Sequence, residues 1–68
     1  MALNSRDIAT ISCRDIAREE DACLIVRIVD GGVALCISLK SDGDIETILT
    51  KDTGARLVEA LQKALADV

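Results

Sequence analysis

The lack of aromatic side chains constrains this sequence more than any other feature. It contains no Phe, Tyr, Trp, His or Pro, yet half of its 68 residues are hydrophobic. The core must therefore be built from Leu, Ile, Val, Ala and Cys, and each missing aromatic removes roughly 150–250 Å² of potential burial. Domains shorter than about 70 residues already bury proportionally little surface. We therefore expect residues 1–68 to form one small domain that is stabilised by a partner subunit.

The middle of the chain predicts an antiparallel meander of three strands. Residues 22–29 are rich in β-branched side chains and end at Asp30-Gly31-Gly32, which supplies the positive φ angles of a tight hairpin turn. Residues 33–39 form the second strand. Gly43 then fits the left-handed position of a turn with a G1 bulge, which leads into a third strand at residues 45–49.

The two-residue period of a strand divides these residues between two faces of the sheet. The first, which we call the major face, is aliphatic throughout. It carries Leu24, Val26, Ile28, Val33, Leu35, Ile37, Leu39, Ile45, Thr47 and Leu49. The opposite side, which we call the second face, carries Cys23, Ile25, Arg27, Val29, Ala34, Cys36, Ser38, Asp44, Glu46 and Ile48.

The C-terminal segment predicts an amphipathic helix that covers the major face. Thr50 is a good N-cap, and apolar residues follow at helical spacing. They are Leu57, Val58, Ala60, Leu61, Ala64, Leu65 and Val68. Gly54 would lie in the first turn, where it weakens the helix, so a later start with Asp52 or Thr53 as the cap stays open.

The N-terminal third is ambiguous. Ala9, Ile11 and Cys13 alternate with polar residues, which favours a strand. Ser12 and Asp15 instead resemble a weak capping box for a short helix through residue 20. Our preferred order is strand, short helical turn, meander and helix. The expected fold is α+β, a three- to four-stranded antiparallel meander sheet with a C-terminal amphipathic helix packed on one face.

The second face is too apolar for a surface that meets water, so we expect either the N-terminal segment or a second copy of the chain to cover it. We hypothesise a homodimer, in which Arg27 and Glu46 would pair twice across a twofold axis. Two other roles for Arg27 stay open, a rim position with its guanidinium in water and anion binding. The candidate interface residues are Ile25, Arg27, Val29, Cys36, Glu46 and Ile48.

Composition argues against most chemistry. Without histidine there is no Ser-His-Asp or Cys-His arrangement, and Cys13, Cys23 and Cys36 lack metal-binding spacing, so we expect thiols with a structural role. We predict no catalytic residue, metal or cofactor. The net charge of −4 and the absence of aromatics argue against direct nucleic acid binding. With no signal peptide pattern at residues 1–7 and no long apolar run, we expect a cytoplasmic protein that does not bind membranes.

The acidic run Glu19, Glu20 and Asp21 predicts either a solvated linker or a patch that docks onto a basic protein surface. The favoured function is therefore a non-enzymatic protein-interaction module, a small homodimeric adaptor or inhibitor. One form of inhibitor, of the kind encoded by phages or mobile elements, would occupy a basic cleft of a nucleic-acid enzyme. The other alternative is a regulatory dimer that binds a small molecule in its seam.

Overall fold

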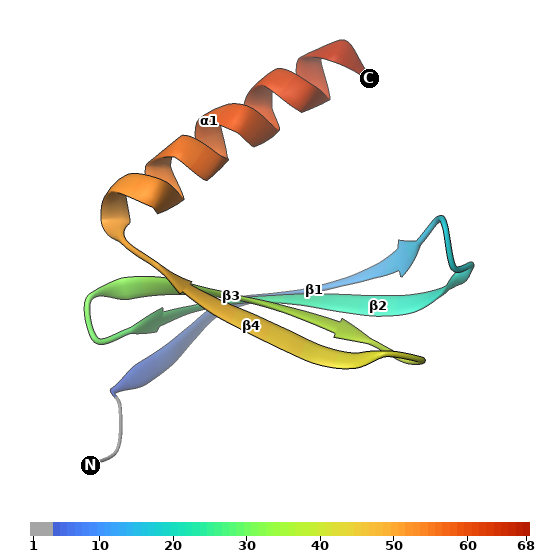
Figure 1. Ribbon diagram of the computed structural model, residues 1–68, viewed down its shortest axis with the longest axis horizontal. Helices are drawn as coiled ribbons and strands as arrows, with labels where there is room; N and C mark the ends of the chain where they lie inside the picture. Colours follow the sequence, from blue (N-terminus) through green and yellow to red (C-terminus); the bar gives the residue numbers. More distant parts are fainter. Residues whose placement is uncertain (1–3) are drawn as a thin grey trace.

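The computed structural model describes residues 4–68. The strands and the helix follow in the expected order, without the short helical turn expected after the first strand. Four antiparallel strands, β1 (Ser5–Asp15), β2 (Glu20–Val29), β3 (Gly32–Leu39) and β4 (Gly43–Leu49), form a sheet in the order β1-β2-β3-β4. The helix α1 (Lys51–Asp67) follows and lies on one side of this sheet (Figure 1). The expected α+β meander with a C-terminal helix is confirmed. The lack of a signal peptide was inferred partly from residues 1–3, which lie outside the described residues.

The two inner turns form as the sequence predicts. Asp30 and Gly31 are the two central residues of the β2–β3 hairpin, with φ of 47° and 82°. Positive φ at both positions is the geometry of a type I′ turn, whose twist matches that of the flanking strands. At the β3–β4 connection Gly43 has a φ of 78°, the left-handed conformation expected of it.

The first connection is a turn and contains no helix. Strand β1 continues to Asp15, and residues 16–19 turn back into β2. One Asp15 carboxylate oxygen accepts hydrogen bonds from the backbone N–H groups of Ala17 and Arg18, at 2.9 and 3.3 Å. Asp15 therefore stabilises the turn as an Asx motif does, and a helix through residue 20 does not form.

The helix begins where its N-cap predicts. Thr50 has extended backbone angles, and its hydroxyl accepts a hydrogen bond from the Thr53 N–H at 3.2 Å. The helix therefore does not start later, with Asp52 or Thr53 as its cap. Gly54 lies in this first turn beside β3, where an added Cβ would make ordinary contact, at 3.7 Å, with a methyl carbon of Val33.

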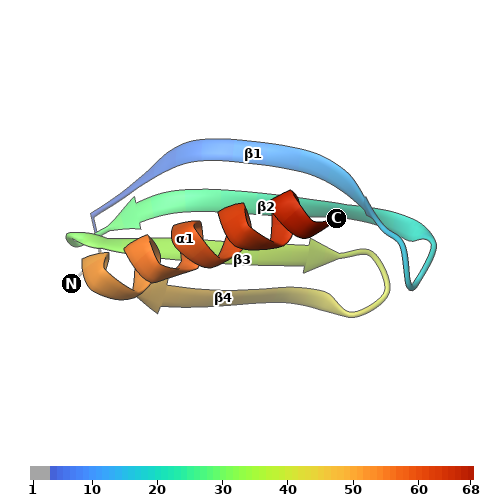
Figure 2. The same ribbon diagram turned by 90° about the horizontal axis from the view of Figure 1, so that it is seen from above.

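Strand register confirms the two predicted faces. Val26 pairs with Leu35, which pairs with Thr47, on the major face, while Arg27 pairs with Ala34 and Ala34 with Ile48 on the second. β1 extends the sheet at its edge beside β2, so residues 5–15 do not cover the second face as one alternative proposed (Figure 2).

The buried apolar core of residues 4–68 is small and lies on the second face. It consists of Val29, Ala34 and Cys36. No residue of α1 is buried. The major face, which the helix was expected to cover, therefore remains largely open.

Candidate functional site

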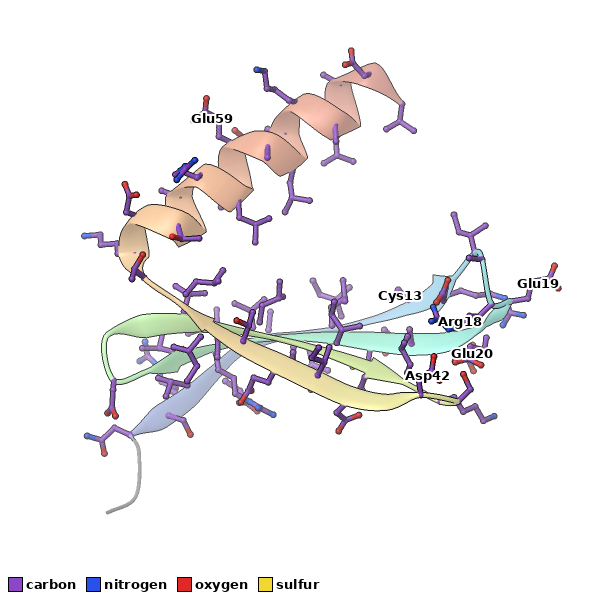
Figure 3. The ribbon with its side chains drawn as sticks, in the orientation of Figure 1. Cys13, Arg18, Glu19, Glu20, Asp42 and Glu59 are labelled. Carbon is purple, nitrogen blue, oxygen red and sulfur yellow. The ribbon has the colours of Figure 1, made fainter. Side chains whose placement is uncertain are left out.

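An apolar groove separates α1 from the major face of the sheet. On the sheet side it is lined by Leu24, Val26, Val33, Leu35, Ile37 and Leu49. On the helix side it is lined by Gly54, Leu57, Val58 and Leu61. Figure 3 shows the facing side chains pointing toward one another across the gap, with Glu59 on the far side of the helix. None of the lining residues is charged or polar, so the groove suits apolar groups alone.

The groove is open because the helix diverges from the sheet along its length (Figure 1). Leu57, in the second turn, is half-buried, but the exposed fraction rises to 53% at Leu61 and 73% at Leu65, and Val68 is fully exposed. These residues belong to the apolar arc that amphipathic spacing predicted. The first two turns therefore anchor α1, while its C-terminal half presents apolar side chains to solvent.

The part of the major face formed by β1 lies beyond the helix. α1 contacts β3 and β4, and seen from above β1 lies outside its path (Figure 2). The bulge in β1 between Asp7 and Ala9 sets the register in which Ala9 and Ile11 pair with Val26 and Leu24 of the major face. Ile11 is 50% exposed. The apolar surface thus extends from the groove to the β1 edge.

The second face is organised around one arginine. Arg27 Nε donates to Asp7 Oδ1 at 2.7 Å, and its Nη1 donates to Glu46 Oε2 at 2.5 Å. Asp7 is on β1 and Glu46 on β4, so the Arg27 side chain reaches across β3 to link the two edge strands. The hydrogen bond to Asp7, followed by the attraction of both carboxylates, raises the pKa of Arg27 above its ordinary value and keeps the guanidinium charged.

Asp7 could not be recognised as a partner of Arg27 from the sequence. Strict alternation from Ala9 would place Asp7 on the major face. The β1 bulge inserts one extra residue between them, and Asp7 pairs opposite Arg27 as a result. Sequence reasoning paired Arg27 only with Glu46, across a twofold axis, and contained no signal that pointed to Asp7.

The structure places the six predicted interface residues together on the second face, with different degrees of exposure. Val29 and Cys36 are buried, Ile25 and Arg27 are half-buried, and Glu46 and Ile48 are exposed. Arg27 and Glu46 pair within one chain. A homodimer interface on this face stays a prediction, and its buried members are already covered in the single chain.

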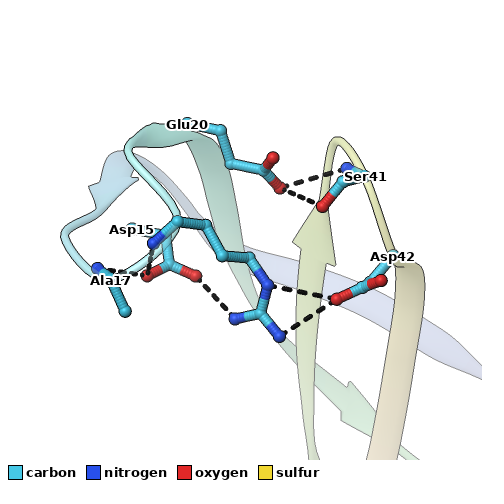
Figure 4. A network of polar contacts seen from close by, with 6 residues as sticks. Asp15, Ala17, Glu20, Ser41 and Asp42 are labelled. Carbon is cyan, nitrogen blue, oxygen red and sulfur yellow. Dashed lines mark hydrogen bonds and ion pairs between the residues drawn. The ribbon is translucent and has the colours of Figure 1, made fainter.

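The acidic residues proposed for docking lie at the sheet end where the first and third turns meet. Glu20 accepts hydrogen bonds from the Ser41 N–H and hydroxyl at 3.0 and 2.8 Å (Figure 4). Asp21 lies 3.4 Å from Arg14, which also donates to the Glu19 carbonyl at 2.5 Å. Within residues 4–68, the Glu19 carboxylate has no such contact. Two of the three predicted carboxylates are therefore engaged inside the chain.

Arg18 ties the same two turns together, a role that sequence reasoning missed. It lies 2.9 Å from Asp15 and 3.0 Å from Asp42 (Figure 4). The Arg18 hydrogen bond lowers the pKa of Asp15, and the same bond raises the pKa of Arg18. These contacts explain the residues structurally, without a ligand.

The three cysteines are free thiols in different surroundings. Cys36 is buried and Cys23 half-buried on the second face, while Cys13 is exposed on β1. The structural role expected for cysteine fits Cys36 well and Cys13 poorly. Within residues 4–68 no group of three possible metal ligands is brought together.

Comparison with known proteins returned no match, whether to family models, to curated proteins or to solved structures. Residues 4–68 contain no helix with the length and apolar character needed to cross a membrane.

Proposed function

We propose that this protein is a non-enzymatic protein-interaction module that works as a homodimer, in the manner of a small cytoplasmic adaptor or inhibitor. The observation that carries the proposal is the open apolar groove between α1 and the major face. An apolar surface of this extent on a soluble chain typically marks a protein contact.

The size of the molecule supports the same conclusion. A compact monomer of 7.2 kDa exposes about 4,100 Å², whereas this chain exposes 5542 Å². Its Cα radius of gyration is 13.3 Å, against about 11 Å for a compact domain of 68 residues. The chain therefore has the surface of a subunit, with roughly 1,400 Å² more than a folded monomer of its mass needs.

A non-enzymatic role is supported by the chemistry of the described side chains. The groups with shifted pKa values, Asp15, Arg18 and Arg27, owe their shifts mainly to ion pairs with each other or with carboxylates at the surface. Structural ion pairs of this kind perturb pKa values without catalysis. With no histidine in the chain, no nucleophile is paired with an imidazole base.

Within this class, an adaptor is favoured over an inhibitor that mimics acidic nucleic acid. Such an inhibitor needs free carboxylates on one surface, but Glu20 and Asp21 are engaged by Ser41 and Arg14. The net charge of −4 still favours a basic partner surface over an acidic one.

Thermal unfolding at a series of protein concentrations tests the proposal. Association that occurs only in the folded state makes the Tm depend on concentration. We expect the Tm to rise steadily over a hundred-fold increase in concentration. A Tm that stays constant, together with a single 7.2 kDa species in solution, would contradict the homodimer.

The second candidate is a regulatory dimer that binds a small apolar molecule. The groove has a volume of about 360 Å³, which lies within the roughly 300–1,000 Å³ range of ligand pockets. Such pockets normally contain a few polar groups that orient the ligand, and this groove contains none. A thermal shift screen against apolar metabolites separates the candidates, because only a ligand-binding dimer is stabilised by such a compound.

A further inference from the structure

The major face is wider than the one helix that the chain places on it. Four strands spaced about 4.8 Å apart give a surface roughly 15–19 Å wide, and a helix with its side chains is about 10 Å across. α1 contacts β3 and β4. A strip roughly 5–9 Å wide on the β1 side therefore stays outside the contact with α1.

The surface left open also specifies the chemistry of its occupant. Leu24 and Val26 of β2 line the groove, and Ile11 extends it onto β1. No charged residue lines the groove, so a strongly charged partner gains nothing there and loses hydration. The fitting occupant is an amphipathic helix whose apolar arc is aliphatic and whose net charge is near zero.

The chain itself contains such a helix. The C-terminal half of α1 exposes Leu61, Leu65 and Val68, which need an apolar surface to contact. Residues 50–68 carry three basic and three acidic side chains, so the whole net charge of −4 lies outside them. Two copies of α1 therefore approach each other without net repulsion.

We propose that the C-terminal half of α1 from a second copy lies on the β1–β2 part of the major face, and that the exchange is reciprocal. This inference rests on the homodimer of the proposed function and assigns its interface. Each helix then covers its own sheet with its first two turns and the partner sheet with its last turns. A twofold axis relates the two contacts, as an isologous interface requires.

The area available fits this arrangement. The chain exposes roughly 1,400 Å² more than a compact monomer of its mass, and the partners of a standard stable interface each bury about 800 Å². Exposed apolar side chains lie on the major face and α1, where Ile11, Leu61, Leu65 and Val68 are at least half exposed. On the second face Ile48 is also 52% exposed, but Val29, Ala34 and Cys36 are already buried within one chain.

Sedimentation equilibrium of the full chain and three variants tests the interface. Leu65→Glu places a charge at the end of the exchanged helix, and Gln62→Glu places the same charge nearby on its polar face as a control. Ile48→Glu places the same charge on the second face, where Ile48 is 52% exposed. Leu65 is 73% exposed in the single chain, so the substitution leaves the fold of one chain intact, which far-UV circular dichroism checks.

We expect wild type, Gln62→Glu and Ile48→Glu to sediment with twice the 7.2 kDa mass of one chain, and Leu65→Glu to sediment as a single chain. If Leu65→Glu prevents folding, Leu65→Ser removes the apolar contact without adding charge and is expected to weaken the dimer at least 10-fold. A dimeric Leu65→Glu beside a monomeric Ile48→Glu would overturn the exchange while the homodimer stands. A monomeric wild type would overturn both.

Discussion

At the scale of single residues, the backbone is most constrained at the β2–β3 hairpin. A Cβ added at Gly32 would lie 2.9 Å from the Leu49 carbonyl oxygen and 3.0 Å from a methyl carbon of Ile48. Both distances are closer than ordinary van der Waals contact. Gly32 is therefore required for the close approach of β3 to β4 just before the helix begins.

We predict that Gly32→Ala lowers the free energy of unfolding by about 1–3 kcal/mol, the usual cost of overpacking. Gly54→Ala is the matched control, since its Cβ would make only ordinary contact with Val33. That control gains up to about 1 kcal/mol of helix propensity. Urea denaturation of the two variants measures whether the free energy of unfolding falls in Gly32→Ala and rises in Gly54→Ala. An unchanged free energy of unfolding in Gly32→Ala would contradict the hairpin geometry.

Asp15 supplies a pH dependence at the same scale. The hydrogen bonds from Arg18 lower the pKa of this carboxyl below its ordinary value of 3.8. A carboxyl whose folded pKa is lowered stabilises the protein above its unfolded pKa, and the contribution is lost as pH falls through the folded pKa.

We therefore predict that Asp15→Asn is less stable than wild type at neutral pH and that the difference shrinks as pH falls from 5 to below the lowered pKa. Thermal unfolding of both proteins across this range is the measurement. A difference that stays constant down to the lowest pH would show that the carboxylate charge of Asp15 has no part in holding the turn.

At the scale of elements, the Arg27 side chain links the two edge strands. Its guanidinium bonds Asp7 on β1 and Glu46 on β4, while Ala34 of β3, which pairs with Arg27, is fully buried. Exposed ion pairs contribute little, at most about 1 kcal/mol each. The aliphatic stem of Arg27, lying over the middle of the sheet, contributes through packing as well.

We predict that Arg27→Met lowers the free energy of unfolding only slightly, since it removes exposed ion pairs and keeps the stem. Arg27→Ala removes both and is expected to cost more. Chemical denaturation of the pair at low and high salt gives the comparison. If both variants lost the same free energy of unfolding, the whole contribution of Arg27 would come from its charge and none from its stem.

Most of this element structure could be predicted from the sequence because it depends on local rules. Alternation set the two faces of β2, β3 and β4, Asp30 and Gly43 marked the turns, and Thr50 marked the start of α1. The contacts made by Asp7 and Arg18 could not be predicted. Asp7 depends on a bulge that reverses the alternation of β1, and Arg18 meets Asp42 only because two distant turns lie at one end of the sheet.

At the scale of the whole molecule, the splay of α1 leaves apolar surface of the helix and of the major face open. Amphipathic spacing predicts which side of a helix is apolar, but it does not predict how much of that side its own sheet covers. Here the first two turns contact the sheet and the last turns do not. A chain without aromatic residues has few large side chains to fill this wedge, and we therefore propose that another subunit supplies the missing apolar contacts.

The most direct test is an isotope-filtered NOE experiment on a mixture of labelled and unlabelled wild-type chains, which reports contacts between subunits only. We predict NOEs between the Leu65 methyl groups of one chain and the methyl groups of Ile11 and Leu24 in the other. Intermolecular NOEs confined to Ile25 and Ile48 of the second face would contradict this account.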